Sequence, residues 1–183
     1  MDTNRKAAAG ARRSVAIYNM IPNLFWSVLN LLPVVVFCYE NVPLKLLYVF
    51  IGISLLTILL PWSFFDRIQL SKKLKVYKRL GVHQVNRFTQ NGTIINALIR
   101  KKYPSYKVVS LSKVQWKKLI QQSYIFEKFH FMMFVFFTIL MVYALIKAFY
   151  GWALIIMLCN LIYNVYPNWL QQYIRLRLRR TVR

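Results

Sequence analysis

The chain contains few acidic residues and few cysteines. Only four of its 183 residues are Asp or Glu, and only two are Cys. With only four carboxylates spread along the sequence, catalysis by paired carboxylates or by two metal ions is not expected. Two cysteines exclude a disulfide framework. The sequence also lacks a His-x-x-x-x-Asp motif, a Gly-x-Ser-x-Gly elbow, a Gly-rich phosphate loop and a His-Glu-x-x-His motif, so the enzymes that depend on these motifs are set aside.

Basic and apolar residues dominate the composition instead. Lys and Arg number 26, the formal net charge is +22 and 58% of the residues are hydrophobic. Disordered chains lack so many apolar residues, and a simple nucleic-acid-binding protein does not carry long uncharged hydrophobic runs. A membrane protein has both properties.

Four runs without Lys, Arg, Asp or Glu at their centres are long enough to cross a bilayer as helices. The sequence therefore predicts an all-α membrane protein of one domain, residues 1–183, with a basic, amphipathic cytoplasmic segment at 66–128. The first run holds several Asn residues and has no small-residue cleavage site, so we interpret it as a retained helix rather than a signal peptide. The four predicted transmembrane helices cover about 15–38, 46–65, 129–146 and 148–174.

The distribution of Lys and Arg predicts the orientation. Four precede the first span, 15 lie in the central segment and five lie in the tail, whereas the two short loops hold one each, Lys45 and Lys147. By the positive-inside rule, both termini and the central segment are expected in the cytoplasm.

The central segment is expected to lie against the membrane. A short basic helix with Leu74 and Tyr77 on one face is predicted to end at Gly81. A second helix is predicted over 93–101, and Ser110 or Ser112 is expected to cap a long helix that continues into the third span. The basic residues predict anionic headgroups as partners; a phosphorylated or CoA-linked substrate is the sharper alternative, and no nucleic-acid motif is present.

Two ionisable residues stand where the third span begins. Glu127 and His130 are three residues apart and share a helix face, and ionisable residues at this depth indicate function. A carboxylate that accepts from one ring nitrogen leaves the other free to remove a proton from a hydroxyl. We therefore predict His130 as a general base oriented by Glu127; an end-of-helix pair in the headgroup layer is the alternative.

Amide side chains recur every four residues on the last predicted helix. Pro167 interrupts this row and deprives the Tyr163 carbonyl of its helical donor, so a local opening is expected there. Asn160 is expected to join neighbouring helices, whereas Asn164, Gln171 and Arg175 are candidates for binding a polar headgroup. The row consists of Asn160, Asn164, Asn168 and Gln172.

Two further groups of polar residues lie outside these motifs. His83, in the loop that follows the basic helix, is a second candidate base, and Asn86 in the same loop is a candidate substrate ligand. His83, His130 and Glu127 could form a three-ligand metal site by number, but they lack metal-typical spacing, so a metal is a minor alternative and none is predicted. On the first helix a polar face is assigned mainly to helix packing; it comprises Asn19, Asn23, Ser27 and Asn30.

The ordered set of these motifs resembles a known family over about the last 120 residues. The family is that of the small membrane acyltransferases of carotenoid-glycoside synthesis, the glycosyl-diaponeurosporenoate acyltransferases of the staphyloxanthin pathway. Gln172 stands where that pattern has Arg, and the hydrophobic run at 46–65 is an addition to it. The motifs are His83-Gln84-Val85-Asn86, Glu127-Lys128-Phe129-His130, Asn164-Val165-Tyr166-Pro167 and 171–178.

The resemblance implies transfer of a fatty acyl chain to a hydroxyl of a membrane glycolipid, in a multi-pass protein of the bacterial inner membrane. It implies no cofactor beyond the acyl donor, for which acyl-CoA and phospholipid both remain open. A non-catalytic integral subunit or assembly factor, bound to a membrane-protein partner through the same polar rows, is the second hypothesis.

Overall fold

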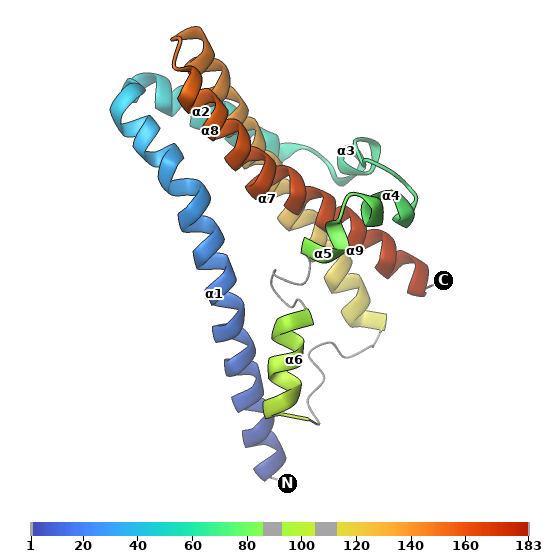
Figure 1. Ribbon diagram of the computed structural model, residues 1–183. Helices are drawn as coiled ribbons and strands as arrows, with labels where there is room; N and C mark the ends of the chain where they lie inside the picture. Colours follow the sequence, from blue (N-terminus) through green and yellow to red (C-terminus); the bar gives the residue numbers. More distant parts are fainter. Residues whose placement is uncertain (1, 86–92, 105–112, 183) are drawn as a thin grey trace.

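The computed structural model describes residues 2–85, 93–104 and 113–182, and this described part is built from helices joined by short turns (Figure 1). Three helices are long and apolar enough to cross a membrane: Arg13–Asn41, Trp116–Ile146 and Tyr150–Arg180. The elements are α1 Asp2–Asn41, α2 Leu44–Leu56, the 3-10 helix η1 Thr57–Leu59, α3 Trp62–Arg67, α4 Leu74–Arg79, α5 Val82–Val85, α6 Thr93–Lys102, α7 Lys113–Ile146, α8 Tyr150–Asn160, the π-helix η2 Leu161–Val165 and α9 Tyr166–Val182.

The second predicted span is shorter than expected. α2 and η1 contain 13 and three residues, about 25 Å at helical rise, which is less than the roughly 30 Å of a hydrocarbon core. The helix ends because Leu60 is extended, with φ −60° and ψ 132°, as expected for a residue before proline. α3 begins anew after Pro61. The prediction of four transmembrane helices is therefore confirmed, by length and composition, for three of them.

The central segment folds onto the last helix. α4 is followed by Gly81 at φ +73°, a left-handed position that favours glycine, so the predicted end of this helix is confirmed. Tyr77, however, is fully buried and packs with Val82, Leu170 and Tyr173. α4 therefore covers α9 with the face that we expected to meet lipid. α6 confirms the predicted second helix, and α7 begins one residue after Ser112, which itself lies outside the described residues.

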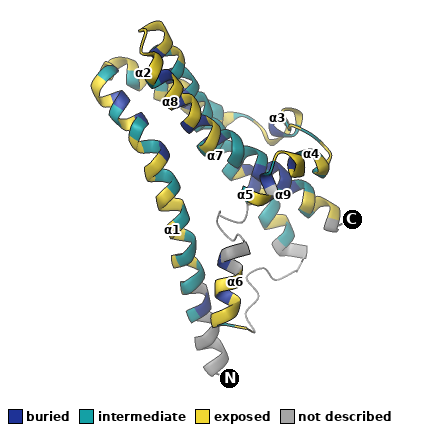
Figure 2. Ribbon diagram, in the orientation of Figure 1, coloured by how far each residue is buried: buried dark blue, intermediate teal, exposed yellow. Residues whose placement is uncertain are grey.

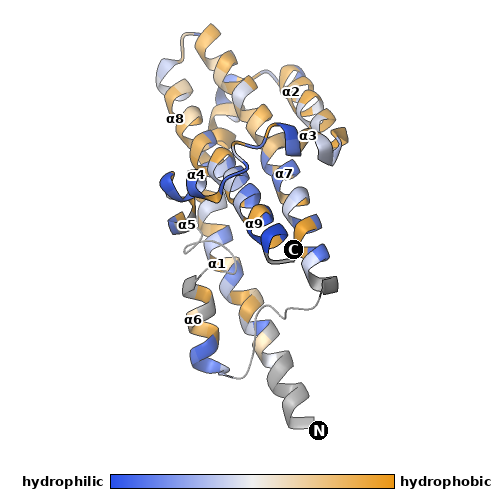
Figure 3. Ribbon diagram, turned by 90° about the vertical axis from the view of Figure 1, so that its right-hand side faces the viewer, coloured by the Kyte–Doolittle hydropathy of each residue, from blue (hydrophilic) through white to orange (hydrophobic). Residues whose placement is uncertain are grey.

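Two apolar clusters hold the helices together. One joins α1, α7 and α8 around Phe37, Phe137, Leu140 and Ile156 and includes the free cysteines Cys38 and Cys159. The other is the α4–α5–α9 cluster around Tyr77, and buried residues gather there in Figure 2. Figure 3 shows hydrophobic residues dominating α2 and α8, whereas α4 and the end of α9 are hydrophilic. Because large apolar side chains on α1, α2 and α8 are exposed, these helices present surfaces suited to lipid.

Candidate active site

The helix that runs from α8 into α9 opens at η2. Pro167 has no N–H to donate to the Tyr163 carbonyl, and the five residues Leu161–Val165 form a π-helix in place of α-helix. The local opening expected from the sequence is therefore confirmed. π-helical turns inside α-helices occur frequently at functional sites. Here the turn places Asn164 inside the protein, with a fully buried side chain.

His130 of α7 faces this opening. Its imidazole lies next to the Asn164 side chain and the Tyr163 carbonyl, and it meets the Tyr163 ring edge-on with the ring centroids 5.9 Å apart. Nδ1 of His130 is buried without a hydrogen-bond partner, and so are the Oδ1 atoms of Asn164 and Asn168. Buried polar atoms are usually hydrogen-bonded, so these three atoms, like Nε and Nη2 of Arg175, have hydrogen-bonding capacity that the described residues leave unused.

Asn160 has the packing role that its position predicted. Its Nδ2 donates to the Phe134 carbonyl and to Thr138 Oγ1 of α7, both at 3.2 Å. Its Oδ1 accepts a hydrogen bond from Asn164 Nδ2 at 2.9 Å. The amide group of Asn164 is thus held in place through its nitrogen, and its side chain also contacts the imidazole of His130.

Glu127 is buried and contacts α9 instead of His130. Its Oε1 accepts from Gln172 Nε2 at 2.7 Å, and its Oε2 accepts from Arg175 Nη1 at 2.5 Å. The prediction that Glu127 orients His130 through a hydrogen bond is therefore wrong. Among the described residues, both carboxylate oxygens of Glu127 have their partners on α9. A cationic guanidinium binds a carboxylate more strongly than a neutral imidazole does, and only the packing of α9 on α7 brings the guanidinium within reach.

Arg175 is fully buried at the centre of a wider network. Its Nε lies 3.7 Å from Asp66 Oδ1, and its guanidinium carbon lies 4.0 Å from the centre of the Tyr124 ring. This burial places Arg175 in the contact between α3, α7 and α9, where its Nε and Nη2 have no hydrogen-bond partner in the described part of the chain. Its predicted substrate contact stays a prediction. The contacts of Arg175 with Glu127 and Asp66 join α9 to α7 and α3.

Asp66 forms the outer part of the same network. Tyr124 donates to its carboxylate at 2.7 Å, and Arg179 donates to it at 3.3 Å. Partial burial raises the pKa of Asp66, but the hydrogen bonds from Tyr124 and Arg179 and the charges of Arg179 and Arg175 outweigh that effect, so the pKa lies below its ordinary value. The carboxylate is consequently ionised at neutral pH.

Gln172 connects this network to the central segment. Its Oε1 accepts from the Tyr77 hydroxyl at 3.0 Å and from the Leu70 amide at 3.1 Å, while its Nε2 binds Glu127. Sequence reasoning missed Asp66, Tyr77 and Tyr124. A signal for Asp66 was present, because it is one of only four carboxylates in a chain with 26 basic residues, and such a residue at a membrane boundary needs a cationic partner.

The remaining predicted residues are placed as follows. Gln171 lies on α9 and is half-buried. His83 lies in α5, which contacts α9, but its side chain is outside the described residues, as is the whole of Asn86. The structure thus brings together His130 with Asn164, and Glu127 with Arg175, in two neighbouring groups along α7.

Comparison with known proteins adds one finding. A family model described as CrtO, glycosyl-4,4'-diaponeurosporenoate acyltransferase, matches residues 61–183. This match covers α3 to α9, including His130, Glu127, Asn164 and Arg175. No curated protein and no solved structure matches the chain.

Proposed function

The chain belongs to the glycosyl-4,4'-diaponeurosporenoate acyltransferase family, and we propose that it transfers a fatty acyl chain to a hydroxyl of a glycosylated membrane lipid. Family membership supports acyl transfer in carotenoid biosynthesis. The three long apolar helices support a substrate that is itself in the membrane. The excess of Lys and Arg in alternate segments supports reaction at the cytoplasmic leaflet, with both termini on that side.

One observation carries the catalytic part of this proposal: Nδ1 of His130 is buried and unpartnered beside Asn164. In the proposed reaction, His130 removes the proton from the acceptor hydroxyl while the hydroxyl oxygen attacks the acyl carbonyl carbon. The bond between that carbon and the leaving group of the donor then breaks, and the leaving group takes the proton from His130. The products are an ester and the protonated leaving group, and the imidazole returns to its starting state.

The amide oxygens near η2 orient the acceptor. Oδ1 of Asn164 and Oδ1 of Asn168 accept hydrogen bonds from hydroxyl groups, and both lack a partner in the described structure. Glu127 and Arg175 support this arrangement by joining α7 to α9, so that His130 and Asn164 face each other. The donor is a thioester such as acyl-CoA or an ester such as a phospholipid; the basic residues of the central segment suit the phosphates of either.

The experiment uses a bacterial host that makes glycosyl-4,4'-diaponeurosporenoate, with acylated product measured by mass spectrometry of extracted lipids. His130→Gln is expected to reduce product formation about 10²- to 10⁴-fold, the usual contribution of positioned acid-base catalysis. Ile125→Leu, a change at an exposed position of the same helix, α7, is the matched control and should retain activity. His83→Gln tests the second candidate base in the same assay.

Full activity of His130→Gln at an equal protein level would remove this residue from the mechanism. An unchanged lipid profile between cells with and without the wild-type protein, together with loss of a membrane complex, would favour the non-catalytic subunit over the enzyme.

A further inference from the structure

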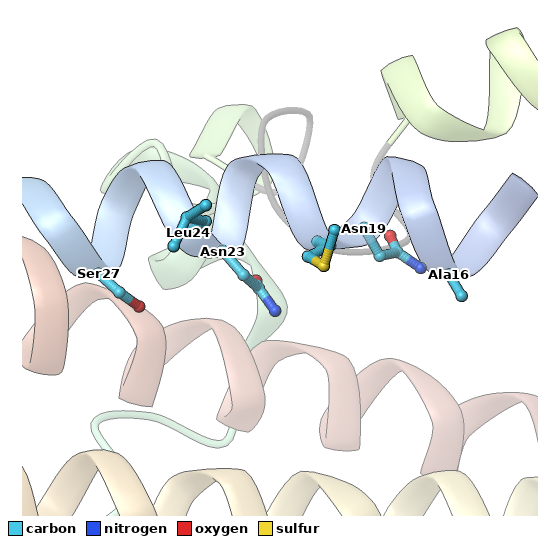
Figure 4. Close-up of a pocket in the computed structure, with 6 residues that line it drawn as sticks. Ala16, Asn19, Asn23, Leu24 and Ser27 are labelled. Atoms are coloured by element: carbon cyan, nitrogen blue, oxygen red, sulfur yellow. The ribbon is translucent and has the colours of Figure 1, made fainter.

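A shallow, uncharged groove lies along one face of α1, beside the site. α1 packs against α8 and η2 and then diverges toward its N-terminus, where it meets α6 (Figure 1). The groove has a volume of about 510 Å³ and follows α1 for about 16 Å at helical rise. It is lined by Ala16, Asn19, Met20, Asn23, Leu24 and Ser27, of which Asn23 and Ser27 point toward the neighbouring α8–α9 helix in Figure 4.

One end of this groove adjoins the candidate catalytic residue. Ser27 Oγ and the Tyr163 hydroxyl are 2.9 Å apart and form a hydrogen bond. The Tyr163 ring in turn contacts the imidazole of His130. A single tyrosine therefore separates the Ser27 end of the groove from His130, and a molecule in the groove has its end near the base.

The lining indicates what kind of group the groove would bind. Its polar groups include the Asn23 amide and the Ser27 hydroxyl, which both donate and accept hydrogen bonds, with the apolar Leu24 between them and Met20 beside them; Asn19 already has an interaction of its own. None of its lining residues is charged, although the chain has 26 basic residues. A phosphate headgroup is normally bound by Arg or Lys, whereas an uncharged headgroup rich in hydroxyls matches a lining of this kind.

We propose that this groove is the subsite for the uncharged sugar headgroup of the lipid acceptor. Asn23 binds sugar hydroxyls, and the Ser27–Tyr163 pair directs the headgroup toward His130. The inference deepens the proposed function, on which it rests for the role of the bound lipid as acceptor. It also revises the assignment of this face of α1 to helix packing, since Asn23 is exposed and is free to contact a ligand.

Lipid retention by the purified full-length protein tests this assignment without requiring turnover. Native mass spectrometry would compare two probes with identical acyl chains, monoglucosyl-diacylglycerol and phosphatidylglycerol. Asn23→Leu is expected to lower retention of the glucosyl lipid about three- to tenfold, the effect of a lost neutral hydrogen bond, and to leave phosphatidylglycerol unchanged. Asn23→Gln, which keeps the amide, should retain binding.

Asn41→Leu is the matched control, because it makes the same change on the same helix outside the groove. The Asn41 side chain donates to the Phe37 carbonyl of its own helix. It should bind both lipids as the wild type does. Equal loss of both lipids in Asn23→Leu, or no loss of the glucosyl lipid, would overturn the assignment.

The His130→Gln variant separates the two proposals. It should retain the glucosyl lipid as the wild type does, since the groove does not depend on the imidazole. If His130→Gln were fully active while Asn23→Leu lost the glucosyl lipid, the catalytic assignment would fail and the groove would stand.

Discussion

Replacement of Arg175 by Met should be the most destabilising single change in the polar network. Arg175 is 0% exposed and Glu127 is 1% exposed. In Arg175→Met the buried Glu127 carboxylate keeps only the hydrogen bond from Gln172. Removing one partner of a buried ion pair costs about 3–5 kcal/mol, because the other charge is left uncompensated. We expect a loss of that size in the free energy of unfolding.

Substitution of the other partner, Glu127→Gln, should lower the free energy of unfolding by less. In Glu127→Gln the guanidinium of Arg175 still has Asp66 at 3.7 Å and the Tyr124 ring at 4.0 Å, and the new amide can still bind Gln172. Loss of a hydrogen bond to a charged group costs about 1.5–3 kcal/mol. The double variant Glu127→Leu/Arg175→Met has no unpaired charge and should be more stable than Arg175→Met alone.

The measurement is reversible unfolding in mixed micelles, followed by circular dichroism as the fraction of denaturing detergent rises. A loss below about 1 kcal/mol in Arg175→Met, or a double variant no more stable than Arg175→Met, would contradict this account of the pair. Either result would mean that water or another group replaces the guanidinium at Glu127.

Three further changes test other parts of the structure. Asp66→Asn should lower the thermal midpoint at neutral pH. Because its partners lower the pKa of Asp66 in the folded protein, the ionised carboxylate stabilises the fold fully above the unfolded pKa of about 3.9. This stabilisation is lost as the pH falls through the lower folded pKa, so the midpoint of the wild type should approach that of the variant there. Pro167→Ala restores a backbone N–H donor for the Tyr163 carbonyl, so an ordinary α-helix would replace η2 opposite His130. The variant should have a higher thermal midpoint and form less product. Unchanged activity would show that the π-helix is dispensable. Gly81→Ala should cost about 1 kcal/mol by equilibrium unfolding, from the φ of +73° alone, since the added Cβ meets its nearest atom, Gln84 Oε1, at an ordinary 3.6 Å.

The features predicted correctly from the sequence depend on local chemistry. Long apolar runs predict membrane helices whatever they pack against, and three of the four expected spans have the required length. The opening before Pro167 and the helix end at Gly81 follow from the missing N–H of one residue and the missing Cβ of the other. The second span was too long because the effect of Pro61 on Leu60 was overlooked.

The partner of Glu127 was not predictable in the same way. His130 is three residues away in sequence, whereas Gln172 and Arg175 are 45 and 48 residues away. Helical spacing shows which side chains share a face, but it does not show which face of α9 packs against that face. Tyr77 illustrates the same difficulty, since it is a plausible lipid-facing residue of α4 until α9 covers it.

The contacts of α7 with α9 and the contact of α1 with Tyr163 are expected to affect different properties of the protein. The ion pair between Glu127 and Arg175 joins α7 to α9 without any contribution from α1, and both helices lie within residues 61–183, which match the family. α1 lies outside that range and approaches His130 through the Ser27–Tyr163 hydrogen bond. Substitutions at Glu127 or Arg175 should therefore change stability and turnover together, whereas Asn23→Leu should raise the KM for a glycosylated acceptor and leave the unfolding free energy nearly unchanged. A parallel fall in stability and in turnover for Asn23→Leu would instead make α1 part of the same cooperative unit as α7 and α9.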